Sequence, residues 1–516
     1  MKKKLIYYSG IISLIILMFT LMFEFNLFLS PKANNIIDNQ DDTIILIKKV
    51  DTIHIINQTY LGNFEHNFYG DSAPESLNII WKKHLGKGTT KVGKESRIWS
   101  GAGWTGQPLM IREKDKKYII QGSYSHEIRK IDAGTGEFIW EYKFDDVIKG
   151  TGSIWLNKNA DTITDKFVIL QGSRKGNNKT GSSKIVPSFR AISYFSGKEL
   201  WRYNSVKTRC YSRDVDGSAI FINDTAYIGL ENGKFLVFDP NYKNADSIDG
   251  ILQPHVFEEH KIYNDNDVKL HGGNLVMEAS VCRLKNRIYI ATGAGHIYGY
   301  NLKTHSIDWD FFTGSDIDGT PVVTHDSCLI VTIEKEYIKG SGGVFKLNPD
   351  LPPDSSVVWF FPTKNKEFHT WAGGIIGSAT VNSYYNKDQR YKNITAFTGI
   401  DGWLYIVDTD SITDKTVLGP NYKKVYPVPH LIYKYETGPS ISTPIIVQNK
   451  IIAAGYRGIY LFSFDEEMNF KLLKKFTAGF EATPFCDNGK IYIASRNGYL
   501  YCFGDKTDNS KGKTNN

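Results

Sequence analysis

A three-residue signature that recurs eight times limits the folds open to this chain more than any other feature of its sequence. Each copy has a small residue, then Ser, Thr or Gln, and then Pro or an apolar residue that opens a strand-like run. Successive copies lie 40 to 65 residues apart, and the shortest of these periods suits one blade of a β-propeller. The middle positions of the copies are Gln107, Ser153, Ser218, Ser280, Thr320, Ser378, Thr443 and Thr483.

The residues between signatures follow one order. An alternating apolar run such as Lys490–Ala494 is followed by a tight turn such as Asn497-Gly498 and then by another strand-like run. Asn-Gly tolerates the positive φ that a two-residue hairpin requires. In three units a Trp lies eight positions after an Asp, Ser or Asn; the pairs are Asp132 and Trp140, Ser193 and Trp201, and Asn301 and Trp309.

Eight such units over residues 76–505 predict an all-β, eight-bladed β-propeller of four-stranded antiparallel blades. The run Asn78–His84 carries Trp81 ahead of the first complete unit, and the last unit ends at Phe503 without an outer strand. We therefore expect the N-terminal run to complete the last blade and close the ring, because closure removes exposed sheet edges.

Residues 1–30 have the pattern of a membrane-targeting segment. Lys2, Lys3 and Lys4 precede an apolar run that reaches Phe23, close to the ~20 residues that span a bilayer as a helix. We interpret it as a transmembrane signal-anchor of the inner membrane that leaves the propeller in the periplasm or outside the cell; a cleaved signal peptide is the alternative. Residues 31–75 are predicted as a tether with at most one strand, and residues 506–516 as a disordered tail.

Composition excludes several classes of protein. The 516 residues are 41% hydrophobic and 13% aromatic, which excludes a largely disordered chain. The net charge of +7 is dispersed, so we expect no nucleic-acid partner. The five Cys form no CxxC or CxxCH pattern, which excludes c-type haem attachment. We interpret them as buried residues, and a bridge between Cys486 and Cys502 stays open.

The repeat resembles that of the PQQ-like (quinoprotein-type) β-propeller family. The resemblance covers about residues 76–505 and is carried by the block Ala133–Trp140, the Gly-Thr-Pro signature at 319–321 and the Gly-x-Leu-Tyr runs. It implies an eight-bladed ring in which Trp residues dock neighbouring blades. The Trp residues in the expected outer strands are Trp81, Trp140, Trp201, Trp309 and Trp359.

The resemblance implies two classes of function. Quinoprotein dehydrogenases use PQQ and calcium and are marked by a vicinal disulfide in the alcohol dehydrogenases and by Glu, Asn and Asp calcium ligands. This chain has no two adjacent Cys, and we assign no catalytic or metal-binding residue by motif. Other members are non-enzymatic scaffolds, such as the propeller lipoprotein of the outer-membrane β-barrel assembly machinery, whose lipid-bearing Cys this chain lacks.

The segments before the first strands of blades one, three, four and six are the most distinctive of their kind. Their Arg, His, Glu and Trp side chains suit a small anionic or planar ligand at the channel mouth. The alternative is that Gly allows tight crossings there and the polar groups bond to backbone. The candidate ligand-binding residues are Arg97, Trp99, Trp104, Arg209, Arg213, Asp214, His271, Asn274, Glu278, His369 and Trp371. We interpret the Asp-x-Asp-Gly segments at 214–217 and 316–319 as turns, since they lack the later ligands of a calcium loop.

The sequence therefore favours a membrane-anchored, monomeric propeller outside the cytoplasm that acts as a non-catalytic binding scaffold. Its partner would be a protein or a small ligand on the channel face. We commit to no cofactor; the alternative is a quinoprotein oxidoreductase with PQQ and calcium in the channel. A polysaccharide-binding surface is a third hypothesis, given the Trp residues of the channel face.

Overall fold

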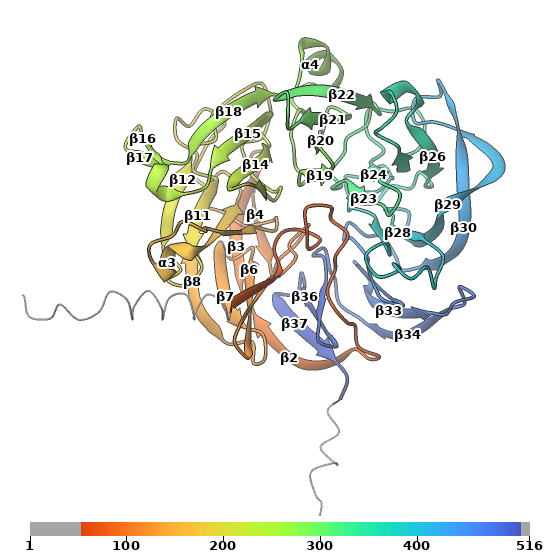
Figure 1. Ribbon diagram of the computed structural model, residues 1–516, viewed down its shortest axis with the longest axis horizontal. Helices are drawn as coiled ribbons and strands as arrows, with labels where there is room; N and C mark the ends of the chain where they lie inside the picture. Colours follow the sequence, from red (N-terminus) through yellow and green to blue (C-terminus); the bar gives the residue numbers. More distant parts are fainter. Residues whose placement is uncertain (1–52, 507–516) are drawn as a thin grey trace, which may run out of the picture. The chain divides into compact units, whose positions relative to one another are not determined.

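Eight β-sheets surround a central channel in the computed structural model, which describes residues 53–506 (Figure 1). The targeting segment 1–30, the first part of the tether and most of the C-terminal tail lie outside the described residues. Within residues 53–506, no helix is long and apolar enough to cross a membrane. The predicted all-β, eight-bladed propeller is confirmed.

The first four blades each contain an inner strand, two middle strands and an outer strand. They are β5 (Leu109–Glu113), β6 (Lys116–Gly122), β7 (Glu127–Asp132) and β8 (Phe138–Lys143); β9 (Ser153–Leu156), β10 (Phe167–Gly172), β11 (Phe189–Ser193) and β12 (Glu199–Tyr203); β13 (Ile220–Ile222), β14 (Thr225–Leu230), β15 (Lys234–Asp239) and β18 (His255–Lys261); and β19 (Cys282–Leu284), β20 (Arg287–Ala291), β21 (His296–Asn301) and β22 (Ser306–Phe312).

The last four blades repeat this order. They are β23 (Val322–Val323), β24 (Leu329–Ile333), β25 (Gly343–Leu347) and β26 (Val357–Pro362); β27 (Thr380–Val381), β28 (Ile394–Thr398), β29 (Trp403–Leu418) and β30 (Val425–Glu436); β31 (Ile445–Val447), β32 (Lys450–Gly455), β33 (Gly458–Phe464) and β34 (Phe470–Phe476); and β35 (Phe485–Asp487), β36 (Lys490–Ala494), β37 (Tyr499–Gly504) and β2 (Asn78–His84).

The remaining elements are additions to this plan. β1 (Ile53–Asn57) adds a fifth strand to the inner edge of the first blade, and two hairpins stand apart, β3 (Lys87–Val92) with β4 (Glu95–Ser100) and β16 (Asp246–Ile248) with β17 (Ile251–Gln253). The described helices are α3 (Ile163–Lys166), α4 (Asp265–His271) and the 3₁₀ turns η1 (Tyr242–Asn244) and η2 (Pro353–Ser355).

The recurring signature has a physical role at the channel. In blades four to seven its middle hydroxyl accepts a hydrogen bond from the backbone N–H of the same position in the preceding blade. Ser218 N–H donates to Ser280 Oγ at 2.9 Å, Ser280 N–H to Thr320 Oγ1 at 3.0 Å, Thr320 N–H to Ser378 Oγ at 2.9 Å and Ser378 N–H to Thr443 Oγ1 at 2.8 Å. These groups are buried, where an unmade hydrogen bond is costly, so the hydroxyl is needed in each of these blades.

The five Trp residues of the outer strands dock blade to blade as predicted. Each indole N–H donates to a backbone carbonyl of the next blade: Trp81 to Ala133 at 3.1 Å, Trp140 to Tyr194 at 2.9 Å, Trp201 to Pro240 at 2.9 Å, Trp309 to Leu351 at 3.0 Å and Trp359 to Thr409 at 2.9 Å. Gly136 and Gly197 have positive φ, and a Cβ on either would approach an indole ring to below 3 Å. These turns therefore require Gly.

The ring closes through its N-terminal strand. β2 pairs antiparallel with β37, from Asn78 opposite Gly504 to His84 opposite Tyr499. The expectation that Asn78–His84 completes the last blade is confirmed. Since β2 supplies the outer strand of the last blade, the outer edge of β37 is not left unpaired at the junction.

The predicted tether differs from the structure over its described part. Residues 57–70, here called the channel plug, cross the channel and bond to all eight blades (Figure 1). Their contacts are with Gln107, Ile154, Ala219, Arg283, Val323, Val381, Thr443 and Cys486. A polar, Asn-rich composition suggested a linker, but these polar groups pair with inner-strand backbone instead of with water.

All five Cys are free thiols, and four of them are buried. Burial raises the pKa of the Cys502 thiol to about 11 and raises that of Cys486 well above its usual range. The interpretation as small buried residues fits four of the five, and Cys486 and Cys502 form no bridge.

Replacing Thr443 with Val tests the hydroxyl ring. Thr443 Oγ1 accepts from Ser378 N–H and bonds to the Tyr60 hydroxyl at 2.7 Å, so Thr443→Val leaves the buried Ser378 N–H without this partner and the Tyr60 hydroxyl with Thr483 alone. We expect the free energy of unfolding, measured by urea denaturation, to fall by about 1–3 kcal/mol. Thr416→Val, an exposed strand position, is the control and should change it by less than about 0.5 kcal/mol. Equal losses in the two variants would contradict this role.

Candidate functional site

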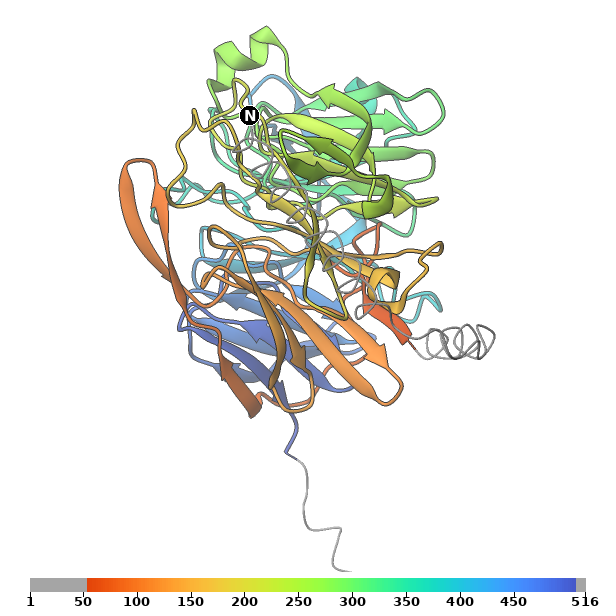
Figure 2. The ribbon, with the colours of Figure 1, turned by 90° about the vertical axis from the view of Figure 1, so that its left-hand side faces the viewer.

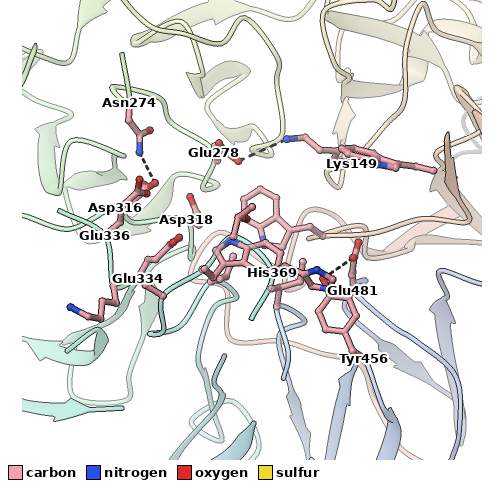
Figure 3. A pocket seen from close by; sticks show the side chains of 18 of the residues that line it. Lys149, Asn274, Glu278, Asp316, Asp318, Glu334, Glu336, His369, Tyr456 and Glu481 are labelled. Atoms are coloured by element: carbon pink, nitrogen blue, oxygen red, sulfur yellow. Dashed lines mark hydrogen bonds and ion pairs between the residues drawn. The ribbon is translucent and has the colours of Figure 1, made fainter. Parts of the chain in front are cut away.

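A cavity of about 1160 Å³ opens at the channel mouth (Figure 3). Its walls come from the segments that lead into the inner strands and from the hairpin turns between the two middle strands. Tyr60 of the plug bonds to Thr443 and Thr483, the signature residues that follow these lead-in segments in blades seven and eight. The plug therefore lies next to the floor of the cavity, and ligands have access from the mouth.

Seven of the predicted site residues line this cavity. They are Arg97, Trp99, Trp104, Asn274, Glu278, His369 and Trp371. The sequence placed them in lead-in segments, but Arg97 and Trp99 belong to the β3–β4 hairpin, which stands out from one face of the ring (Figure 2, orange). Arg97 is exposed and pairs with Glu95 at 2.9 Å, whereas Trp99 turns toward Tyr124 with ring centroids 5.1 Å apart.

The other four predicted residues have different surroundings. Arg209 is exposed and pairs with Asp265 at 2.7 Å, and Arg213 is buried and donates to the carbonyls of Ser205 and Ser183. Asp214 accepts from Arg174 at 2.7 Å, and His271 packs against Tyr337 with ring centroids 4.6 Å apart. Arg213 therefore follows the alternative expectation, in which a polar side chain of these segments bonds to backbone and does not contact a ligand.

One wall of the cavity is acidic. Asp316 and Asp318, in the segment before β23, meet Glu334 of the β24–β25 turn, with ligand-capable oxygens within 4.8 Å of one another. Asn274 Nδ2 donates to Asp316 Oδ2 at 2.7 Å (Figure 3). Burial, reinforced by the charge of Asp316, raises the pKa of Glu334 to about 9, and burial raises those of Asp316 and Asp318 well above their usual range.

A second acidic group lies beside it and holds a lysine. Lys149 pairs with Asp216 and lies 3.9 Å from Glu278. Burial alone would lower the pKa of Lys149, but the negative charges of Asp216 and Glu278 outweigh it and raise that pKa. Burial raises the pKa of Glu278 to about 7, even though Lys149 opposes the shift.

The wall built by blades seven, eight and one is aromatic, and its charged side chains pair with one another. Glu481 accepts from Arg496 at 2.7 Å and from the Tyr456 hydroxyl at 2.8 Å. The Arg496 guanidinium lies 5.0 Å from the Tyr124 ring centroid. The cavity is thus divided into an acidic side with unpaired carboxyls and an aromatic side whose charges are already paired.

The acidic wall was not predicted from the sequence. Asp316 and Asp318 were interpreted as part of a turn, and Lys149, Glu334, Glu481 and Arg496 were not considered. A signal was present, because both Asp-x-Asp-Gly segments run directly into a signature copy at Gly217 or Gly319. The position of the signature at the channel then places the carboxylates near the mouth.

The family described as outer membrane protein assembly factor BamB matches residues 74–350, more than half of the chain. The chain belongs to this family of PQQ-like propellers. No curated protein matches its sequence.

Solved structures similar to this PQQ-like propeller share its fold at low sequence identity. A europium-containing methanol dehydrogenase is 12% identical with a TM-score of 0.54, over 90% of this chain and 100% of its own. The quinohemoprotein alcohol dehydrogenase from Comamonas testosteroni is 12% identical with a TM-score of 0.53, over 88% and 82%. BamB from Moraxella catarrhalis is 12% identical with a TM-score of 0.48, over 84% and 98%.

The residues present fit a hard cation and a planar anion. The carboxyl oxygens of Asp316, Asp318 and Glu334 with the Asn274 amide form an oxygen donor set of the kind that calcium prefers. Arg97 and the indole of Trp371 line the same cavity and could contact a planar, carboxylate-bearing cofactor such as PQQ.

The raised pKa of Glu334 predicts that this residue lowers the free energy of unfolding by an amount that depends on pH. A free Glu ionises near its ordinary value of 4.5, so between about pH 4.5 and 9 the unfolded chain holds fewer protons here, and stability falls as pH rises. We expect Glu334→Gln to be more stable than the wild type by about 1–3 kcal/mol at pH 8 and nearly equal to it at pH 4.5, by urea denaturation. The exposed Glu137→Gln should be neutral at both pH values. A Glu334→Gln effect independent of pH would refute the shift.

Proposed function

We propose that this propeller is a non-catalytic binding protein that takes a small ligand, or the side chains of a protein partner, in the cavity at its channel mouth. The observation that carries the proposal is the cavity itself, with unpaired carboxyls on one side and aromatic rings on the other.

We infer that a ligand enters only part of the channel, because the channel plug lies behind the cavity. The channel plug bonds to the inner strands of all eight blades, so the propeller is bridged behind the cavity. A pocket of this size with a few convergent polar groups is typical of small-ligand sites. We propose that the propeller works as a monomer.

A ligand screen by thermal unfolding tests binding at the mouth. A ligand at 100 times its dissociation constant should stabilise the wild type by about 2.7 kcal/mol. We expect Trp371→Ala to lose most of that stabilisation, because the indole lines the cavity. Trp403→Ala, outside the cavity lining, should keep it. Ligands that stabilise Trp371→Ala as much as the wild type would place the binding site elsewhere.

A quinoprotein oxidoreductase is the second candidate, favoured by one observation. Carboxyls of Asp316, Asp318 and Glu334 and the amide of Asn274 converge in a cavity that indoles also line. PQQ bound there would accept the two electrons of an alcohol or sugar oxidation. In that case the carboxyls would hold calcium, and a carboxyl left free of the metal could receive the substrate proton.

Titration with PQQ and calcium separates the two candidates. We expect no dye-linked oxidation of alcohols or sugars by the purified protein under these conditions, with quinone absorbance as the readout of binding. Saturable quinone binding together with dye reduction that Asp318→Asn abolishes would overturn the non-catalytic proposal. Glu137→Gln serves as the control, since it removes an exposed charge outside the cavity lining.

We propose further that the propeller lies outside the cytoplasm, attached to the inner membrane through its N-terminal segment. The proposal rests on the three Lys residues ahead of the apolar run in residues 1–30. A reporter that is active only outside the cytoplasm, fused to the C-terminus of the full chain, should be active. A stable but inactive fusion would reverse this orientation.

A further inference from the structure

Three groups of carboxylate or His side chains among residues 53–506 gather closely enough to hold a cation. They are Asp216 with Glu231 and Glu278, His325 with Asp326 and Asp410, and Asp316 with Asp318 and Glu334. Clusters of this kind cost free energy unless a positive charge compensates them. Whether the chain places a positive charge beside each group therefore indicates which group is left to bind a cation from outside.

In two of the three groups a lysine of the chain supplies the cation. Lys149 pairs with Asp216, lies 3.9 Å from Glu278 and has its ammonium 5.7 Å from the Trp104 ring centroid. Lys346 is almost completely buried, and its ammonium lies 2.7 Å from Asp326 and 3.3 Å from Asp410. Each of these ammonium groups thus occupies a place that a metal ion could otherwise take.

The third group has no such lysine within the described part of the chain. Asp318 and Glu334 keep only 9% and 5% of their surface exposed, line the cavity, and form no ion pair with a described residue. The neighbouring Lys335 does not serve, because its ammonium donates to the carbonyls of Ile338 and Gly340. Within the described residues this group therefore has no lysine of its own, and all three of its carboxyls line the cavity, where a ligand can reach them.

We propose that the group of Asp316, Asp318 and Glu334 binds the ammonium of a ligand, in the way that Lys149 fills the neighbouring group. The inference rests on the proposed function and names the chemistry of its ligand, an organic amine. Tyr337 and Tyr211 line the same cavity and are well exposed, so rings are available beside the carboxyls. Rings next to carboxyls stabilise an alkylammonium through cation–π contact, which a small hydrated metal ion uses less well.

The amine can come from a free polyamine or from the lysine side chains of a peptide, and the experiment has an arm for each. Spermidine and a tetralysine peptide blocked at both ends are titrated into the full-length protein by calorimetry, with the peptide's fully acetylated form as the neutral control. Calcium and lanthanum are titrated in parallel, and each is then used to compete with the amine.

The matched variants carry the same change of charge at different places. Asp318→Asn with Glu334→Gln neutralises the group, while Glu137→Gln with Glu467→Gln removes two exposed charges outside the cavity lining. Circular dichroism checks that both variants fold. We expect at least one amine to bind the wild type and the control variant alike, and to bind the neutralised variant at least about tenfold more weakly.

Amine binding and metal binding give different results in these titrations. Binding of spermidine alone or of tetralysine alone supports the proposal and identifies the source of the amine. Binding of calcium or lanthanum that amines do not displace, or amine binding that survives neutralisation, overturns it. Different results would contradict the proposed function, namely quinone-dependent turnover or ligands that stabilise Trp371→Ala as much as the wild type. Failure of the amine proposal and failure of the proposed function can therefore be told apart.

Discussion

The hydrogen bonds that link signature hydroxyls from blade to blade hold the channel in place, and the rest of the structure depends on them. Four of these hydroxyls accept from the backbone of the preceding blade, so they fix the spacing of the inner strands from blade three to blade seven. Tyr60 then joins the plug to this ring through Thr443 and Thr483. The cavity keeps its shape because its lead-in segments end at these fixed points.

Much of the fold could be predicted because its determinants are local and repeated. A signature and a Gly turn recur along the chain, so the blades and the closing strand followed from spacing, whereas the docking role of the Trp residues followed from the family resemblance. The plug could not be predicted in this way. Its decisive contacts, such as Tyr60 with Thr443, join residues 383 apart, and no local pattern encodes them.

The candidate site shows the same limit at the level of single side chains. The repeat indicated which segments reach the channel mouth, but not which side chains turn into the cavity. Arg213 and Asn274 come from comparable segments, yet Arg213 bonds to backbone carbonyls whereas Asn274 faces Asp316. That choice depends on packing between blades, and Glu334 was missed because it belongs to a turn between middle strands.

Charge compensation explains why function concentrates on one side of the mouth. The chain neutralises three buried acids around the cavity, Asp214 with Arg174, Asp216 with Lys149 and Glu481 with Arg496. Among the residues that the structure describes, Asp318 and Glu334 have no such ion pair, and they line the cavity, where a ligand can reach them. Burial and the charge of Asp316 raise the pKa of Glu334, and a cation bound beside these carboxyls would lower that pKa again.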